Sequence, residues 1–204
     1  MSTRLQELAA LASTCTRCRL SAGRTQVVFA DGSPDADLMF IGEGPGYHED
    51  KQGLPFVGAA GQLLNRLLGE IGMRREEVRI TNVVLCRPPG NRDPLPDEIE
   101  TCKPYLMEQI ELVDPAVITT LGNFATRVIL DRPVAISKVR GQLHPWNDRV
   151  VIPTFHPAAV LRGGGDSSRT MEAIRQDFAT IRETLLDARR TGGPVRAEEQ
   201  LGLF

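Results

Sequence analysis

Four short β-branched segments alternate along the chain with segments whose apolar residues recur at helical spacing. The predicted strands are residues 37–41, 78–85, 117–121 and 150–155. Helices are predicted before residue 15, over 63–71, from residue 97 onward, over 124–130 and over 171–185. Strands that alternate with helices are joined by right-handed crossovers and form a mostly parallel sheet covered on both faces. We therefore predict an α/β fold with a short, mostly parallel four-stranded sheet flanked by helices.

Glycine and proline set three of the expected boundaries. Gly72 is a typical helix C-cap and should end the helix over 63–71. Pro104 predicts that a second helical segment begins there, because proline favours the first turn of a helix. Pro153 predicts that the last strand lies at a sheet edge or ends near this residue.

The composition is that of a globular chain. With 204 residues, 41 % of them hydrophobic, we expect one domain over 1–190 and a flexible tail over 191–204. No apolar run reaches the ~18 residues of a membrane span and no signal peptide is recognisable, so we expect a cytoplasmic protein. We also expect a monomer. Lys and Arg number 24 against 26 Asp and Glu, a formal net charge of −2. Such a chain could bind nucleic acid only through a local basic patch and a specific pocket.

Three polar side chains stand at the ends of predicted strands. Glu43 lies in the loop after the first strand, Asn82 near the end of the second, and His156 directly after the fourth. In open parallel sheets, ligands bind beyond the carboxyl ends of the strands. Either Asn82 or His156 alone could be a structural polar residue, but together the three predict one shared crevice.

The glycines at 42, 44 and 46 do not form a nucleotide fingerprint. A G-x-G-x-x-G motif starting at Gly42 would need glycine where Tyr47 stands, and the segment 53–58 lacks the lysine of a phosphate loop. We expect these glycines to let the backbone approach a flat ligand closely. A simple tight turn would explain the glycines but not Glu43 among them.

Four cysteines combine one close pair with two isolated residues: Cys15, Cys18, Cys86 and Cys102. Zinc ribbons usually contain two close pairs, whereas four thiolates can also converge on a four-iron cluster. The spacing leaves open a metal site or free buried thiols, and it does not distinguish zinc from iron.

Five segments resemble, in order and over about residues 5–185, the motifs of the family 4 uracil-DNA glycosylases: Cys15–Leu20, Phe40–Gly46, Gly53–Gly58, Thr81–Asn82 with Cys86–Arg92, and Phe155–Pro157. The resemblance implies a three-layer α/β/α fold and removal of uracil from DNA at the start of base-excision repair. It also implies one structural 4Fe-4S cluster held by the four cysteines. For a prokaryotic glycosylase of this kind, the expected location is the cytoplasm, in association with the nucleoid.

The resemblance also assigns roles around the uracil. Glu43 would act on the hydrolytic water or the developing cation, and His156 would contact uracil O2. Phe56 would stack on the base, Asn82 would read its pyrimidine edge, and Glu49 would help to exclude thymine. Tyr47 and His48 depart from the more acidic family sequence, so Tyr47 is a second candidate for thymine exclusion. The uracil-binding set is completed by backbone positions Gly42 and Gly44.

Four residues are the expected DNA contacts outside the uracil site: Asn91, Arg92, Leu161 and Arg162. Leu161 and Arg162 would enter the duplex beside the flipped nucleotide, where an apolar wedge offsets part of the unstacking cost of a few kcal/mol. No lysine in the motifs could form a Schiff base, so we expect hydrolysis without strand cleavage.

The end of the chain resembles the short peptide with which bacterial DNA-processing proteins bind the replication sliding clamp. The candidate residues are Gln200, Leu201, Leu203 and Phe204. The alternative is a disordered end with incidental apolar residues.

Two other functions remain open at this point. One is a nucleic-acid-binding module that kept an iron-sulfur or zinc site and lost the chemistry. The other is a related enzyme that links covalently to DNA through a histidine in a basic insertion before the last strand. Nothing over residues 127–149 resembles that insertion, although His144 lies within this range.

Overall fold

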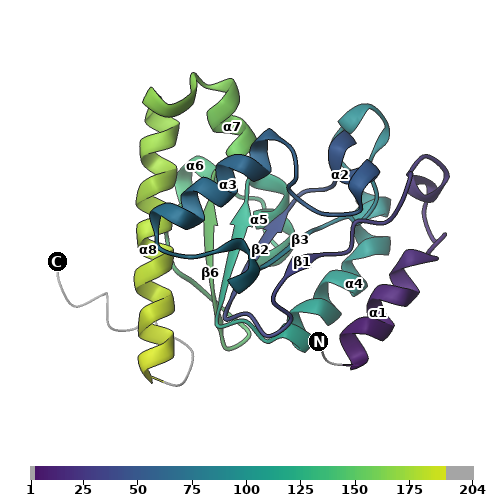
Figure 1. The fold of residues 1–204 in the computed structure, drawn as a ribbon, viewed down its shortest axis with the longest axis horizontal. Helices are drawn as coiled ribbons and strands as arrows, with labels where there is room; N and C mark the ends of the chain where they lie inside the picture. Colours follow the sequence, from purple (N-terminus) through teal and green to yellow (C-terminus); the bar gives the residue numbers. More distant parts are fainter. Residues whose placement is uncertain (1–2, 192–204) are drawn as a thin grey trace.

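The computed structural model describes residues 3–191, which form a six-stranded mixed sheet with the order β1-β3-β2-β4-β6-β5 (Figure 1). The strands are β1 (Asp31–Gly32), β2 (Leu38–Gly42), β3 (Arg79–Asn82), β4 (Val117–Leu121), β5 (His144–Trp146) and β6 (Arg149–Thr154). The four inner strands are mutually parallel, whereas β1 and β5 pair antiparallel at the two edges. The α/β class and the four inner strands are confirmed.

The predicted number of strands is wrong, because β1 and β5 were missed. They contain two and three residues, respectively. Segments this short cannot show the period-two alternation by which a strand is recognised in a sequence. Only pairing with β3 and β6 makes them part of the sheet.

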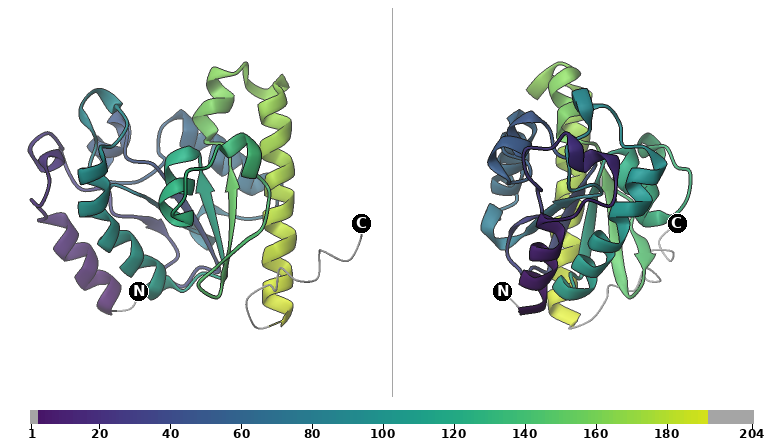
Figure 2. Two further views of the ribbon diagram at one scale, coloured as in Figure 1. Left: turned by 180° about the vertical axis from the view of Figure 1, so that it is seen from behind. Right: turned by 90° about the vertical axis from the view of Figure 1, so that its right-hand side faces the viewer.

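Helices cover both faces of the sheet. They are α1 (Thr3–Ser13), α2 (Tyr47–Gln52), α3 (Ala59–Glu70), α4 (Pro96–Val113), α5 (Asn123–Leu130), α6 (Ile136–Val139), α7 (Pro157–Arg162) and α8 (Arg169–Thr191). The first face packs against α3 and α8, and the second packs against α4 and α5, which Figure 2 shows from behind. Helix α1 lies outside this layer and packs on α4 (Figure 1).

Strand β2 divides its side chains between two cores. Leu38 and Phe40 belong to the core under α3 and α8, whereas Met39 and Ile41 belong to the core under α4 and α5. Every residue of β2 is buried, as expected for the central strand of a parallel sheet covered on both faces. The Phe40 ring also stacks on the ring of Phe178 in α8, with centroids 5.7 Å apart.

The predicted break at Pro104 is wrong, because α4 runs without interruption from Pro96 to Val113. A proline inside a helix loses the hydrogen bond to the carbonyl four residues earlier. Here that residue is Glu100, which is exposed. The predicted strand end at Pro153 is confirmed, since Pro153 is the penultimate residue of β6 and β5 pairs only with residues 149–151.

Helix α8 reaches Thr191, and the predicted clamp-binding peptide at residues 200–204 lies outside the described residues. Within residues 3–191, none of the helices is both long enough and apolar enough to cross a membrane.

Candidate active site

A cavity of about 520 Å³ opens at the carboxyl ends of the inner strands. Nine of the predicted site residues line it: Glu43, Gly44, Glu49, Phe56, Asn82, Asn91, Arg92, His156 and Arg162. Two predicted residues do not line it. Gly42 ends β2 beneath the side chains of Phe56 and Asn82, and Leu161 lies on α7, where it is 46 % exposed.

Close packing requires glycine at position 42. A Cβ atom there would lie 2.4 Å from Asn82 Oδ1 and 2.6 Å from Phe56 Cζ. The other two glycines of the loop also make room for protein atoms, since a Cβ at Gly44 or Gly46 would lie 2.7 Å from Val84 Cγ2 or 2.8 Å from Glu49 Oε2. The loop glycines therefore let side chains of this chain converge on the cavity.

Phe56 forms a wall of the cavity and stacks on His156, with ring centroids 5.6 Å apart and an interplanar angle of 26°. Its φ of +53° is uncommon for a residue with a side chain. Arg75 holds this backbone by donating to the carbonyl oxygens of Pro55 and Phe56, at 2.5 and 3.2 Å, while it also pairs with Asp31. An unfavourable backbone conformation held by its surroundings is typical of a functional position.

Asn82 lines the cavity and has an unused hydrogen-bond acceptor. The side chain is 2 % exposed, and its Oδ1 is buried with no hydrogen-bond partner among the described residues. Buried polar atoms are nearly always paired, so an unpaired amide oxygen at a cavity wall indicates a ligand that carries a donor.

His156 is held as a neutral ring with one defined donor. Burial lowers its pKa to about 4; repulsion from Arg162 acts in the same direction, and Glu49 opposes it. The Nδ1 atom accepts a hydrogen bond from the backbone N–H of Ala158 at 3.1 Å, at the start of α7. A neutral imidazole that accepts at Nδ1 carries its proton on Nε2. The ring therefore offers an Nε2–H donor.

Glu43 changes charge near neutral pH. Burial raises the pKa of its carboxyl to about 7; repulsion from Asp93 adds to this effect, and attraction to Arg162 opposes it. Asp93 was not among the predicted site residues, although it directly follows Asn91 and Arg92. A carboxyl group in a cavity with a pKa near 7 is suited to take up a proton or to stabilise a developing positive charge.

Glu49 lines the cavity and also fixes its wall. Its Oε1 atom accepts hydrogen bonds from the backbone N–H groups of Val57 and Gly58 at 3.0 and 2.9 Å. These two residues directly follow Phe56, and Gly58 is the N-cap of α3. One carboxylate therefore connects α2, the Phe56 turn and the start of α3.

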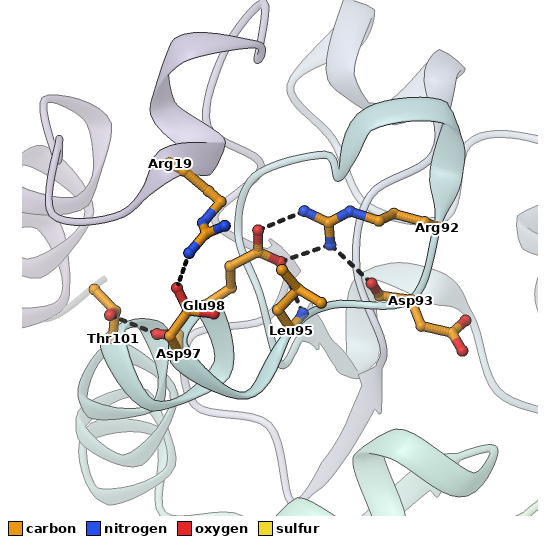
Figure 3. Close-up of polar contacts among 7 residues, drawn as sticks. All are labelled: Arg19, Arg92, Asp93, Leu95, Asp97, Glu98 and Thr101. Carbon is orange, nitrogen blue, oxygen red and sulfur yellow. Dashed lines mark hydrogen bonds and ion pairs between the residues drawn. The ribbon is translucent and has the colours of Figure 1, made fainter.

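The guanidinium of the predicted DNA contact Arg92 is engaged within the protein (Figure 3). It donates two hydrogen bonds, of 2.8 and 2.6 Å, to the carboxylate of Glu98, which is completely buried. The same guanidinium donates to the carbonyl of Asp93, and Glu98 also accepts from the backbone N–H of Leu95. These contacts, the Arg92–Glu98 clamp, fix the cavity loop over 88–95 to the first turn of α4.

Two further predicted residues have partners within the protein. Asn91, with a φ of +56°, accepts a hydrogen bond from Arg87 Nε at 2.7 Å. His144, the candidate for covalent attachment, lies on β5 with Nδ1 3.1 Å from Arg132 and is absent from the cavity lining. Two further lining residues, Asn123 and Phe124, lie in no motif that could identify them, whereas Phe155 belongs to the Phe155–Pro157 motif but had no predicted role.

All four cysteines line the same small cavity, separate from the first, together with Arg24 and Tyr105. Cys15 and Cys18 lie between α1 and the short helix over Arg19–Ala22, Cys86 follows β3, and Cys102 lies in α4. Two sulfur atoms accept hydrogen bonds: Cys86 from Arg24 at 3.4 Å, and Cys102 from the backbone N–H of Leu85 at 3.3 Å. Over residues 3–191, no three His, Cys, Asp or Glu side chains are arranged to hold a single metal ion. Four thiols around one cavity supply the kind and number of ligands that a four-iron cluster takes.

Comparison with known proteins gives one consistent family. A model described as the uracil DNA glycosylase superfamily matches residues 29–179. The type-4 uracil-DNA glycosylase of Sulfurisphaera tokodaii is 44 % identical over 186 residues, covering 87 % of this chain and 83 % of that protein. The type-4 uracil-DNA glycosylase of Thermotoga maritima is 50 % identical over 157 residues, covering 76 % of this chain and 82 % of that protein. A third type-4 uracil-DNA glycosylase, from Saccharolobus solfataricus, is 44 % identical over 84 % of this chain and 82 % of its own length.

The Arg92–Glu98 clamp predicts a specific loss of stability in a Glu98→Gln variant. The substitution keeps the shape of the side chain but removes its charge, and hydrogen bonds to charged groups contribute about 1.5–3 kcal/mol each. We expect the free energy of unfolding, measured in urea, to fall by about that amount, with faster proteolysis within residues 88–95. The control Glu100→Gln alters an exposed glutamate of the same helix and should change stability by less than about 0.5 kcal/mol. Equal stability of the two variants would contradict a role for the clamp.

Proposed function

Because the chain belongs to the uracil-DNA glycosylase superfamily, we propose that its cavity binds a uracil nucleotide flipped out of DNA and that the surrounding side chains hydrolyse the N-glycosidic bond. The chain is a DNA glycosylase, a hydrolase that excises uracil from DNA in repair. The observation that carries the assignment of residues is the convergence of Glu43, Asn82 and His156 on one cavity.

Asn82 reads the pyrimidine edge of uracil in this proposal. Its unpaired Oδ1 meets the N3–H donor of uracil, while its amide N–H₂ reaches O4. Cytosine has an acceptor at N3 and would leave two buried acceptors facing each other, which a polar site rejects strongly. Phe56 supplies the apolar surface on which the base stacks, and Glu49, already held by two backbone N–H groups, excludes the thymine methyl group.

His156 stabilises the departing base. Cleavage of the N-glycosidic bond leaves negative charge on uracil, and a donor directed at O2 lowers the energy of that charge in the transition state. The Nε2–H of His156 is such a donor. Because the pKa of His156 is about 4, the ring performs this role as a neutral imidazole above that pH.

Glu43 acts on the sugar side of the bond. Bond cleavage leaves an oxocarbenium-like sugar, which a carboxylate stabilises and which a water molecule activated by that carboxylate attacks. No lysine lines the cavity among the described residues, in agreement with hydrolysis that leaves an abasic site without a Schiff base.

Leu161 and Arg162 face the DNA beside the flipped nucleotide. Leu161 is an exposed apolar residue on α7, between Ala159 and Arg162, which both line the cavity. Unstacking a base costs a few kcal/mol, and an inserted apolar side chain offsets part of it. Asn91 lies at the cavity as a further DNA contact, whereas Arg92 acts through the Arg92–Glu98 clamp.

The four cysteines would hold one 4Fe-4S cluster. Hydrolysis of the N-glycosidic bond moves no electrons, so the role of the cluster would be structural. When bound, it would crosslink the segment before residue 19, the loop after β3 and helix α4. Arg24 and the backbone N–H of Leu85 donate to two of the sulfurs, and these hydrogen bonds stabilise the thiolate form that ligation requires. The proposed enzyme is a monomer. The end of its chain would bind the sliding clamp through four residues: Gln200, Leu201, Leu203 and Phe204.

A strand-nicking assay tests the catalytic roles. Labelled duplexes with U·G, U·A, T·G or C·G pairs are treated with alkali after incubation, and only the uracil duplexes should be cut. We expect Glu43→Ala and His156→Ala to lower the single-turnover rate by about 10²-fold or more, the usual cost of losing a transition-state contact. His144→Ala, a histidine outside the cavity, is the control and should leave the rate unchanged. Absence of nicking by the folded, intact protein would favour the binding module instead.

The pKa of Glu43 predicts the pH dependence of the reaction. Because this pKa is raised to about 7, Glu43 is largely protonated below that pH and charged above it, so the single-turnover rate should rise with a midpoint of about 7. Asp93→Asn removes a repulsive charge and should move the midpoint to lower pH. The profile is measured between about pH 5 and 9. A rate independent of pH over this interval would contradict the role of Glu43 as a charged group.

Metal analysis and thermal unfolding test the cluster. Cys102→Ser should reduce both the iron and the sulfide content of the purified protein and lower its melting temperature, because the variant removes one ligand from α4. Zinc in place of iron, or unchanged iron content in the variant, would contradict a cluster held by these four cysteines.

A further inference from the structure

Tyr47 is a large exposed side chain beside the active site. It is the first residue of α2 and is 51 % exposed. The residue before it, Gly46, lines the cavity, but Tyr47 itself is absent from the lining, unlike the other candidate for thymine exclusion, Glu49. The geometry therefore places Tyr47 outside the uracil-binding cavity, on its rim.

Two cations lie against the Tyr47 ring. Arg87 Cζ is 5.1 Å and Lys51 Nζ is 5.9 Å from the ring centroid, both within the range of a cation–π interaction. Lys51 lies one turn after Tyr47 on α2, whereas Arg87 lies in the loop after β3, directly after Cys86. We call Tyr47, Lys51 and Arg87 the Tyr47 patch.

Both cations of the Tyr47 patch keep their charge available. Arg87 donates to the side-chain oxygen of Asn91 at 2.7 Å, and Lys51 donates to the hydroxyl of Thr25 at 3.1 Å; both partners are neutral. In the described part of the chain, neither cation forms a salt bridge, whereas several other arginines pair with carboxylates: Arg66, Arg92 and Arg175. A chain with a net charge of −2 needs a local basic surface of this kind to bind DNA.

The Tyr47 patch is joined to the cavity on two sides. Gly46, which lines the cavity, directly precedes Tyr47 in the chain. Asn91, which also lines the cavity, accepts a hydrogen bond from Arg87. Helices α2 and α7 lie at the same end of the sheet in both views (Figures 1 and 2). The helix with Tyr47 and the helix with Leu161 are therefore at the end of the sheet where the cavity opens.

We propose that the Tyr47 patch binds the phosphodiester backbone next to the flipped nucleotide, with Arg87 and Lys51 neutralising phosphates and the Tyr47 ring holding both cations in place. This inference rests on the proposed function, because it assumes a DNA strand that enters the cavity. It assigns Tyr47 to strand binding and leaves thymine exclusion to Glu49.

Salt dependence distinguishes a phosphate contact from a structural role. The affinity of a duplex with a tetrahydrofuran abasic site is measured by fluorescence anisotropy over a series of salt concentrations. Each phosphate contact that is lost lowers the slope of log affinity against log salt by about 0.9. We expect weaker binding and this smaller slope for Arg87→Ala and Lys51→Ala. Tyr47→Ala should resemble them, whereas Tyr47→Phe keeps the ring and should retain the wild-type slope.

Arg4→Ala is the matched control, since Arg4 is an exposed arginine on α1 that already pairs with Glu108. It should leave slope and affinity unchanged. Unchanged slopes in both Arg87→Ala and the exposed, readily tolerated Lys51→Ala would overturn the proposal. Excision of thymine from T·G duplexes by Tyr47→Ala would also overturn it, because Tyr47 would then act inside the cavity. Wild-type protein that shows the expected slopes but releases no uracil would refute the proposed function and leave the Tyr47 patch standing.

Discussion

The absence of a side chain at Gly42 is the constraint on which the cavity depends. Phe56 and Asn82 occupy the space that a Cβ atom would need, and the Phe56 ring in turn stacks on His156. Residues from three separate parts of the chain thus meet over the end of β2. Arg75 and Glu49 hold the Phe56 turn from outside, so that a backbone conformation unfavourable for phenylalanine becomes the stable one.

Burial shifts the pKa values of His156 and Glu43 in opposite directions. The same loss of water lowers the pKa of His156 to about 4 and raises that of Glu43 to about 7, because burial disfavours the charged form of either group. Arg162 increases the first shift and reduces the second. At neutral pH the cavity thus holds a neutral imidazole and a carboxyl group that can be charged.

Ion pairs at the start of α4 connect separate segments of the chain. The Arg92–Glu98 clamp uses its arginine to hold the loop over 88–95 on α4, the helix that also carries Cys102. Arg19, next to Cys18, pairs with Asp97 in the first turn of that helix (Figure 3). The segments that carry the cysteines and the cavity loop are therefore connected through one helix end. In contrast, the cations of the Tyr47 patch donate hydrogen bonds to neutral partners.

The sequence by itself determined the α/β class, the four inner strands and the convergence of Glu43, Asn82 and His156. These features follow from local periodicity and from the rule that parallel strands end at one edge. Only the tertiary structure decided the edge strands, the continuity of α4 through Pro104, the role of Arg92 and the effect of Asp93 on Glu43. Two- and three-residue strands form only against a neighbour, and whether a charged side chain is paired or free depends on groups distant in the chain. Burial, which sets both pKa values, is likewise a property of the assembled fold.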